Sequence, residues 1–360
     1  MRTQYQSIRE AFTAMRRESK ARHRDIAEKL NISEGELIAA HVGASAADPN
    51  VIVQATCLRA DWPEIVASLE PLGEVMALTR NASCVHEKTG VYRKVTHNNQ
   101  IGLVLGGEID LRIFYQQWAH GFSVSERSDQ GLQRSLQFFD AAGIAIHKIF
   151  MKPQSELAEF EGLVMRFAAD EQIEGIMPTA SAAKASEIAD AEIDVAGFRQ
   201  AWTSLRDTHE FFGMLKKFSV SRVQALRLAD PQFVCKVDAS SCQELLQSAA
   251  GEGVPIMVFV GNPGMIQIHS GPIKKFAVMG PWVNVLDTGF NLHLREDHIA
   301  SAWVVKKPTV DGLVTSLELF DAEGETIAMF FGERKPGKPE LCEWRELIEN
   351  LLQESEPCDL

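Results

Sequence analysis

Two stretches of the chain repeat the same order of apolar and polar residues at an offset of 181 positions. Gly131 to Phe150 aligns without a gap to Gly312 to Phe331, and ten of the twenty residues are identical. The identical residues of the first copy are Gly131, Leu132, Ser135, Leu136, Phe139, Asp140, Ala141, Gly143, Ile146 and Phe150. Because further pairs at this offset begin at Met76 and Met257, we infer a tandem duplication that spans most of each half.

Each copy contains the sequence S-L-x-x-F-D-A-x-G-x-x-I, in which two strand-like runs flank a tight-turn composition typical of a β-hairpin. Short apolar runs upstream predict further strands in both copies. These runs are Glu74 to Thr79, Gly102 to Leu105, Ile109 to Phe114, Val254 to Val260, Asn284 to Leu286 and Phe290 to Leu294. We therefore expect a mainly antiparallel sheet in each half.

Amphipathic segments around these strands predict helices. They are Gln6 to Arg17, Arg24 to Leu30, Glu34 to Ala40, Pro63 to Leu69, Glu156 to Ala168, Val195 to Arg206, Thr208 to Phe218, Ser240 to Ala250 and Glu340 to Glu354. The predicted fold class is α+β, with a tandem structural duplication in which each half is a large antiparallel β-sheet flanked by helices.

The segment between the two copies, residues 170–194, has a different composition. It is acidic, rich in Ala and Ser, broken by Pro178 and without a sustained apolar stripe, which is typical of a linker. We predict a first repeat domain over residues 1–169, a linker over 170–194 and a second repeat domain with a C-terminal helix over 195–360. A chain of 360 residues is long enough for two cores.

The overall composition limits the class of protein. With 45% apolar and 24% charged residues, the chain lies in the normal globular range. The longest apolar run, Val254 to Val260, is far shorter than the roughly 20 residues of a membrane span, and no signal sequence opens the chain. We therefore expect a cytoplasmic protein.

Two further features exclude common binding sites. The six cysteines, from Cys57 to Cys358, show no C-x-x-C pair or regular spacing, which argues against a disulfide framework, a zinc finger or an iron–sulfur cluster. A formal net charge of -13 disfavours broad binding to nucleic acid.

The positions at which the two copies differ are the candidates for chemistry, because duplicated scaffolds keep their packing residues in both copies. Arg112 lies in a predicted strand where the second copy has His293. Such a cation could bind an anionic or polarised ligand group, although an exposed strand arginine paired with an acid is commoner. His86, which corresponds to Gln267, is a second-tier ligand candidate, and a surface histidine is the commoner alternative.

A second difference is the segment from Asp207 to Lys217. His209 starts a predicted helix whose other residues are mostly Phe, Met and Leu, with lysines at its far end. Imidazole is a common iron ligand, aromatic residues suit a flat macrocycle, and cations suit propionates. Taken by itself, such a histidine is more often a helix-capping or core residue.

A third difference is the pair Lys306 and Lys307, which stands where the first copy has Ser125 and Glu126. The apolar run before it makes the pair a candidate anchor for a carboxylate. A solvated loop is the commoner alternative.

Several motifs in order match one known family. They are Thr79-Arg80-Asn81, Val85-His86-Glu87, Asp110-Leu111-Arg112, Trp118, Thr208-His209-Glu210-Phe211-Phe212, Gln267-Ile268-His269-Ser270-Gly271-Pro272 and Phe331-Gly332. Through these motifs, inside a tandem duplication, the chain resembles nearly end to end the HemS/ChuS/PhuS family of bacterial cytoplasmic haem-utilisation proteins, also called haemin-degrading factors.

The resemblance implies that one b-type haem binds in a cleft to which both halves contribute. His209 takes the place of the histidine that ligates the haem iron, and Arg112 matches an arginine on the opposite haem face. The residues that would line the pocket or hold propionates are Phe114, Phe212, Arg222 and one of Lys306 or Lys307. Some members carry extra histidines just after the ligand, where this chain has Glu210 and Phe212.

The resemblance leaves two functions open. An enzyme would cleave the haem macrocycle to release iron, with His209 as ligand and Arg112 donating charge-assisted hydrogen bonds to a water or oxygen species. A binding module would buffer haem and pass it on. Because no flavin or nicotinamide fingerprint is visible, electrons would come from a partner; a haem-uptake transporter or a separate haem oxygenase are the other implied partners.

A third interpretation is DNA binding. Arg24 to Leu37 has helix-turn-helix spacing after a basic stretch, but the second helix begins Ser-Glu-Gly-Glu, which suits phosphates poorly. A plain helical hairpin that packs on the first sheet is the favoured interpretation.

Overall fold

The computed structural model describes residues 4–19, 21–45, 51–98, 100–129, 131–180, 186–334 and 337–354, so that Cys358 lies outside the described residues. The chain divides into two compact units. Unit 1 contains Met1–Arg80, Glu87–Ala182 and Asn262–Gln267. Unit 2 contains Asn81–His86, Ala183–Gly261 and Ile268–Leu360. Each unit therefore includes a short segment from the opposite half of the sequence.

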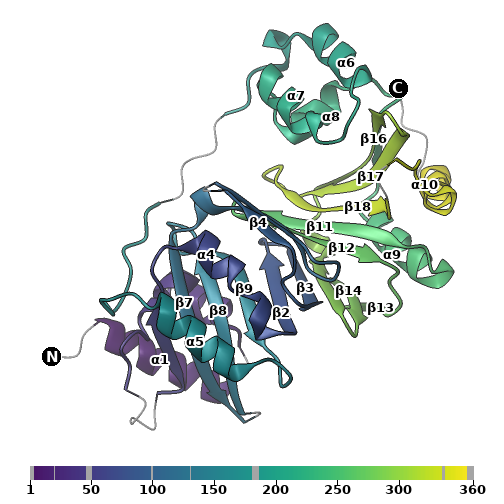
Figure 1. Cartoon of the computed structure of the whole chain (residues 1–360). Coiled ribbons are helices and arrows are strands. Elements are labelled where there is room, and N and C mark those ends of the chain that lie inside the picture. The colour runs from purple at the N-terminus through teal and green to yellow at the C-terminus, as the bar shows by residue number, and fades with distance from the viewer. Residues whose placement is uncertain are drawn as a thin grey trace. The chain divides into compact units, whose positions relative to one another are not determined.

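The first repeat supplies five α-helices and nine strands among the described residues. Their arrangement is shown in Figure 1. The helices are α1 (Gln4–Glu18), α2 (His23–Lys29), α3 (Glu34–Ala39), α4 (Trp62–Ala67) and α5 (Leu157–Phe167). The strands are β1 (Val53–Cys57), β2 (Val75–Arg80), β3 (Cys84–Gly90), β4 (Val95–His97), β5 (Ile101–Leu105), β6 (Asp110–Phe114), β7 (His120–Ser128), β8 (Gly131–Phe139) and β9 (Ala145–Met151).

The second repeat supplies the same numbers in the described part of the chain. The helices are α6 (Val195–Thr203), α7 (Glu210–Phe218), α8 (Arg222–Leu228), α9 (Ser241–Glu252) and α10 (Cys342–Glu354). The strands are β10 (Val234–Val237), β11 (Ile256–Asn262), β12 (Met265–Gly271), β13 (Phe276–Met279), β14 (Trp282–Asp287), β15 (Phe290–Arg295), β16 (Ser301–Thr309), β17 (Gly312–Phe320) and β18 (Thr326–Gly332).

The predicted α+β fold with a tandem duplication is confirmed. Strands β3, β7, β8 and β9 recur residue for residue as β12, β16, β17 and β18 at the offset of 181 found in the sequence. All predicted helices form, with ends that shift by a few residues. Helix α8 and the strands β1, β3, β4 and β7 with their second copies were not predicted from the sequence.

The strands follow the same order in both units. In unit 1 they run β1-β7-β8-β9-β2-β3, with a second run β12-β6-β5-β4. In unit 2 the corresponding runs are β10-β16-β17-β18-β11-β12 and β3-β15-β14-β13. The pairs β7–β8 and β8–β9 are antiparallel, as are β16–β17 and β17–β18. The expected antiparallel sheet is thus present in each half.

The Asp-Ala-x-Gly sequence closes a tight turn in both copies, as predicted. Asp140 Oδ1 accepts hydrogen bonds from the backbone N–H of Ala142 at 2.9 Å and of Ile144 at 2.8 Å. Asp321 repeats this pattern in the second copy. Gly143 and Gly324 have φ of 77° and 73°, so the turn needs a residue that tolerates the left-handed region.

The segments that each unit takes from the opposite half are held by equivalent asparagines. Asn262 lies in unit 1, where its Nδ2 donates to the carbonyls of Arg80 and Ile146, both at 2.9 Å. Asn81 lies in unit 2, where its Nδ2 donates to the carbonyls of Gly261 at 3.1 Å and Ile327 at 2.8 Å. Each asparagine and its two carbonyl partners lie 181 positions from the corresponding residues of the other group. The exchange of segments therefore follows the internal repeat.

In unit 1 the sheet lies between two helical layers. On one face, α4 and α5 pack on β8 and β9 through residues such as Trp62, Phe138 and Phe160 (Figure 1). On the other face, α1 to α3 pack through Phe12 and Leu37. Both clusters are buried, which follows from the alternation of apolar residues along the strands.

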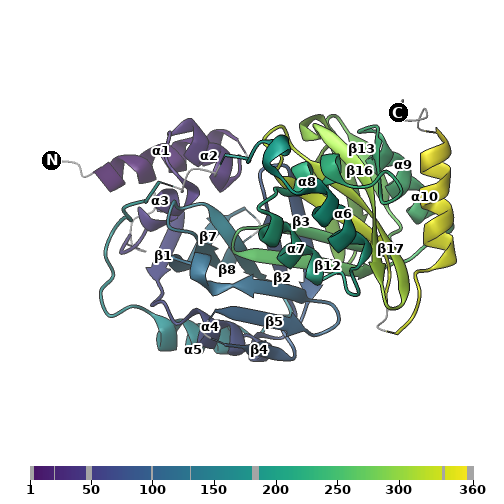
Figure 2. The same ribbon diagram turned by 90° about the horizontal axis from the view of Figure 1, so that it is seen from above.

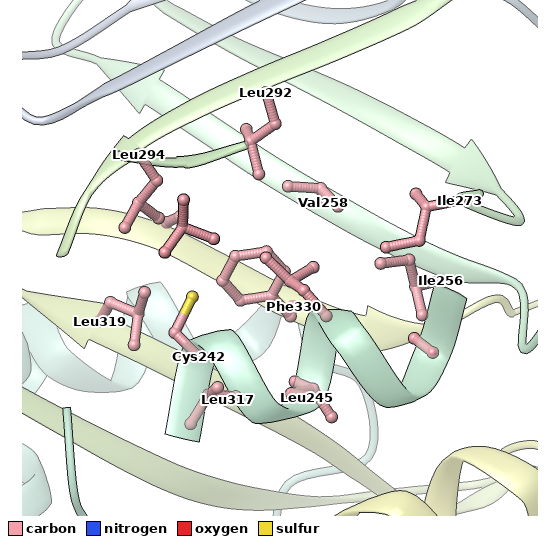
Figure 3. Packing of buried hydrophobic residues seen from close by; sticks show 14 of the residues in the cluster. Cys242, Leu245, Ile256, Val258, Ile273, Leu292, Leu294, Leu317, Leu319 and Phe330 are labelled. Atoms are coloured by element: carbon pink, nitrogen blue, oxygen red, sulfur yellow. The ribbon is translucent and has the colours of Figure 1, made fainter. Parts of the chain in front are cut away.

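Unit 2 has the same layers. Figure 3 shows Leu245 of α9 packed with Leu317 and Phe330 of the sheet, and α10 lies beside α9 (Figure 2). The opposite face carries α6, α7 and α8, which bury Trp202 and Phe211. The segment that begins with His209 is therefore supported by a core of its own.

The N-terminal helices form the helical hairpin that the sequence favours over a DNA-binding motif. Helix α3, which would be the recognition helix, is buried at Glu34, Gly35, Leu37 and Ile38. Gly35 also donates its N–H to the carbonyl of Gly143 at 2.9 Å. A helix covered in this way has no free face to enter a DNA groove.

Candidate functional site

His209 lies at the N-cap position of α7 and is the most exposed of the predicted site residues, with 88% of its side chain accessible. Its Nδ1 lies 2.6 Å from Oδ1 of Asp207, and the same oxygen accepts the His209 backbone N–H at 2.8 Å. These two hydrogen bonds lower the pKa of Asp207, which stays a carboxylate. His209 is therefore neither a core histidine nor a side-chain cap.

The contact with Asp207 decides which nitrogen of His209 can bind a metal. A carboxylate that accepts from Nδ1–H fixes the tautomer in which Nε2 carries the lone pair. The exposure of the ring leaves Nε2 accessible. This is the carboxylate–histidine arrangement that orients metal-ligating imidazoles in proteins. Asp207 was missed as a functional residue although it stands two residues from His209 in the sequence.

Two neighbouring phenylalanines of α7 have opposite environments. Phe212 is 74% exposed, which makes it a candidate contact for an apolar ligand beside His209. Phe211 is buried, and its ring meets the ring of Trp202 edge-on with centroids 4.8 Å apart. The helix thus presents one aromatic ring to solvent and uses the other as an anchor.

Arg222 and Lys307 both bind the carboxylate of Glu318. Nε of Arg222 donates to Oε2 at 2.6 Å, its Nη2 donates to Oε1 at 2.8 Å, and Nζ of Lys307 donates to Oε1 at 2.6 Å. Lys307 and Glu318 are buried, whereas the side chain of Arg222 keeps 23% exposure. Of the two cations, Arg222 is therefore the one with donors near the surface.

Lys306 lies next to Lys307 in β16 and is half-buried. Its backbone N–H donates to the carbonyl of Phe233 at 2.7 Å, and its carbonyl accepts from Nε1 of Trp202 at 3.0 Å. The alternative interpretation of Lys306 and Lys307 as part of a solvated loop is therefore wrong, because both residues lie in a strand. The alternation of the strand turns Lys307 inward, where Glu318 compensates its charge.

Arg112 and Phe114 lie in β6 of unit 1, on the face that is not packed in the core. Arg112 donates to Oδ1 of Asp110 at 2.5 Å, and burial raises the pKa of Asp110 while the arginine lowers it. The cross-strand partners on β5 are Leu103 opposite Arg112 and Ile101 opposite Phe114. An arginine–carboxylate pair thus stands in an apolar strand face.

The pair equivalent to Arg112 and Leu103 is polar in the second repeat. His293 takes the place of Arg112, and its cross-strand partner Asn284 takes the place of Leu103. Nδ1 of His293 lies 2.7 Å from Oδ1 of Asn284, whose Nδ2 donates to two backbone carbonyls. On the same face, Trp282 and Arg295 take the places of Ile101 and Phe114 and contact each other at 5.3 Å. A cation opposite an apolar residue at the position of Arg112 is therefore specific to the first repeat. Ile101 and Leu103 could not be predicted from single positions, because their place opposite Phe114 and Arg112 depends on the pairing of β5 with β6.

His86 is not at the surface. It is fully buried in β3, and its ring packs on the ring of Phe290 with centroids 4.9 Å apart. The ring of His269 also stacks on Phe290, with centroids 3.8 Å apart. The expected alternative of a surface histidine is wrong, since β3 runs through the interior of the sheet.

Within unit 2 the structure places His209, Phe212, Arg222, Lys306 and Lys307 on or beneath the helical layer that contains α7. Within unit 1 it places Arg112 and Phe114 side by side on β6. No group of three or more His, Cys, Asp and Glu side chains able to hold a metal ion occurs in the described part of the chain. Among the described residues, no helix is long and apolar enough to cross a membrane.

Comparison with known proteins places this chain among haem-utilisation proteins. The family model for the haemin-degrading HemS/ChuX domain matches twice, over residues 31–167 and 219–351. The hemin transport protein HmuS of Yersinia pestis is 38% identical over 341 residues, which cover 93% of this chain and 95% of HmuS.

Two solved structures extend the similarity to the fold. Holo-PhuS, described as a heme-binding protein from Pseudomonas aeruginosa, is 44% identical with a TM-score of 0.92, covering 97% of this chain and 99% of PhuS. The heme degrading enzyme ChuS of Escherichia coli O157:H7 is 36% identical with a TM-score of 0.86, covering 96% and 99% of the two chains. The double match, the sequence identity and the coverage agree with one another, and the chain belongs to the haemin-degrading HemS/ChuX-domain family.

Proposed function

We propose that this protein binds one b-type haem through coordination of the iron by Nε2 of His209, and that it carries this haem in the cytoplasm of a bacterium that takes up haem for iron. The observation that carries the proposal is the pair His209–Asp207. An exposed imidazole whose Nδ1 is held by a carboxylate at 2.6 Å is prepared to bind a metal through its other nitrogen.

The surroundings of His209 suit a flat, amphipathic ligand. The exposed ring of Phe212 offers an apolar surface one turn or less from the imidazole. Arg222 offers guanidinium donors with partial exposure for a ligand carboxylate, although Glu318 already uses two of them. Lys306 is the second candidate for such a carboxylate, because Lys307 is buried against Glu318.

The strand face around Arg112 is proposed to contact the same haem from its other side. Ile101, Leu103 and Phe114 supply apolar area there, and Arg112 supplies the only guanidinium on the described residues of β5 and β6. That His209 and Arg112 act on one haem stays a prediction. PhuS and ChuS, which are described as binding and degrading heme, support it as relatives of the whole chain.

A haemin titration tests the proposal. The purified protein is titrated with haemin while the Soret band is followed, together with His209→Ala and His97→Ala as a matched control at another exposed histidine. We expect saturation at one haemin per chain, a shifted Soret band and weaker binding for H209A, and no change for H97A. An H209A protein that binds with the wild-type spectrum and affinity would refute the ligand assignment.

Haem degradation is a second candidate function, favoured by the similarity to an enzyme that degrades heme. Bound haem would supply the redox chemistry. The residues of this chain would hold it through His209, exclude water with Phe114 and Phe212, and donate hydrogen bonds from Arg112. Electrons would come from an external donor, and a haem-uptake transporter and a haem oxygenase remain proposed partners for delivery and transfer.

Product analysis separates degradation from transport. The haem complex is mixed with ascorbate and catalase under air, and bilin, carbon monoxide and free iron are measured. An enzyme releases all three in proportion to the haem lost, and Arg112→Gln slows the release. If the Soret band persists with every electron donor while haem passes to a haem oxygenase, the protein is a carrier.

A further inference from the structure

The carboxylate of Glu318 lies at the centre of a buried ionic cluster beneath α7. It accepts two hydrogen bonds from Arg222, at 2.6 and 2.8 Å, and one from Lys307 at 2.6 Å. Ser316 Oγ adds a fourth at 3.0 Å. Four donors satisfy the accepting capacity of a carboxylate, which is why Glu318 can be ionised with no exposed surface.

The charges of this cluster persist in spite of burial. Burial alone would raise the pKa of Glu318, but Arg222 and Lys307 hold it well below its usual range. Burial lowers the pKa of Lys307 to about 8, and Glu318 acts in the opposite direction. The cluster therefore consists of two cations on one anion at neutral pH.

Both cations also contact the ring of Phe211. Nζ of Lys307 lies 4.5 Å and Cζ of Arg222 lies 5.1 Å from the ring centroid, within the range of cation–π attraction. Phe211 is the second residue of α7 and stands two positions after His209. The ionic cluster therefore reaches the first turn of the helix that presents the haem ligand.

The first repeat arranges its ion pairs differently. The offset of 181 relates Glu318 to Gln137, whose amide donates to Ser135 Oγ at 3.1 Å. The buried ion pair of that repeat joins Lys148 to Glu34 on α3 and contains one cation. In the first repeat the partly buried Glu126 pairs with Arg16 and His23. Among the described residues, a fully buried carboxylate that binds both an arginine and a lysine beside a phenylalanine ring is found in the repeat that carries His209.

We propose that Glu318 is a positioning residue for His209: it holds Arg222 and Lys307 against Phe211, and Phe211 fixes the first turn of α7 and with it the direction of the imidazole. Its role in haem binding rests on the proposed function. Its role in ordering α7 does not, because that order exists in the protein without ligand.

Hydrogen exchange of the haem-free protein tests the ordering of α7. The variant is Glu318→Gln, which keeps the shape of the side chain and removes its charge. The matched control is Glu34→Gln, which likewise leaves one buried lysine without its carboxylate, but in the first repeat. We expect the amides of α7 to exchange about tenfold faster in E318Q and at the wild-type rate in E34Q.

A haemin titration of the same two variants tests the consequence for the ligand. We expect E318Q to bind haemin about tenfold more weakly and with altered Soret and charge-transfer bands, as for a ligand held in more than one orientation. E34Q should keep the wild-type spectrum and affinity. This spectroscopic difference would not arise from a general loss of stability, which both variants share.

The outcomes separate this inference from the proposed function. Wild-type exchange of α7 in E318Q, or equal acceleration by E34Q, overturns the inference. Faster exchange in E318Q together with a haemin spectrum that does not depend on His209 supports the ordering of α7 and overturns the proposed function. If E318Q does not fold, Lys307→Met removes one cation from Phe211, leaves the Arg222 pair intact, and must accelerate exchange in α7.

Discussion

Nδ1 of His209 and Oδ1 of Asp207 lie 2.6 Å apart at the start of α7, and the backbone N–H of His209 donates to the same oxygen. The carboxylate thus controls both the tautomer and the orientation of an imidazole that is otherwise surrounded by solvent. An unsupported histidine with this exposure would sample several rotamers, so binding would have to order it first.

Replacement of Asp207 by Asn removes the charge from this pair. We expect D207N to weaken haemin binding by about tenfold and to raise the reduction potential of the bound haem, because a carboxylate increases the basicity of the imidazole. The measurements are a titration and a spectroelectrochemical potential. The control is Asp297→Asn, an exposed aspartate that pairs with Arg295. Equal potentials for D207N and the wild type would show that Asp207 does not tune the ligand.

Leu103 faces Arg112 across β5 and β6, and the second repeat has Asn284 at the same place. Replacement of Leu103 by Asn introduces that polar residue into the apolar face. Loss of about 1 kcal/mol of apolar contact should weaken haemin binding about fivefold. The melting temperature should change little, since Leu103 lies on the face away from the core. Leu132→Asn, at an exposed leucine of β8, should leave haemin affinity unchanged.

Asn262 and Asn81 each donate two hydrogen bonds to backbone carbonyls at the corners of the exchanged segments. Replacement of either by Ala should lower the free energy of unfolding by about 1–3 kcal/mol, because two partly buried carbonyls lose their donor. Urea denaturation measures the effect. Asn350→Ala on the surface of α10 serves as the control. A loss below 0.5 kcal/mol, as is usual for surface substitutions, would show that these corners contribute little.

His147 and His41 predict loss of stability in acid. Burial lowers the pKa of His147 to about 3 and that of His41 to about 4. The unfolded chain takes up these protons near pH 6.5, whereas the folded protein does not, so stability is full above pH 6.5 and falls as the pH decreases towards 4. Each histidine contributes a slope of up to about 1.4 kcal/mol per pH unit.

Denaturation in urea between pH 7.5 and 4.5 measures this slope, and His147→Gln isolates one contribution. H147Q should be less stable at pH 7.5, because Thr79 and Tyr92 lose their partner, but its stability should fall less steeply with acidification. His97→Ala should leave the slope as it is. An H147Q protein with the wild-type slope would contradict the assignment of His147 as a neutral buried group.

The sequence predicted the repeat, the helices and the turns because these depend on local patterns. Helix α8 was missed because it has seven residues and follows Ser219, whose left-handed conformation ends α7 without a proline or glycine signal. The exchange of segments at Asn81 and Asn262 was missed for another reason. An apolar strand has the same pattern whichever strand lies beside it, so the pattern does not specify the neighbour.

The candidate site was predicted in part. The comparison of the two copies singled out Arg112, His209 and Lys307 as positions that differ. The resemblance to the family supplied their expected roles in haem binding. Glu318 also differs between the copies, since Gln137 stands at its equivalent position, but it was not among the residues singled out from the sequence. Lys307 faces inward because alternate residues of β16 point into the core. The sequence alone did not define which of the alternating residues these are.

The exchanged segments also affect the order in which the chain can fold during synthesis. Unit 1 includes Asn262–Gln267, which leave the ribosome long after the rest of that unit. Strand β12 and the Asn262 hydrogen bonds to Arg80 and Ile146 are therefore absent until nearly half of the second repeat has emerged. A nascent first repeat is incomplete over this interval, with the edge of β6 that β12 later covers open to chaperones or to a neighbouring chain.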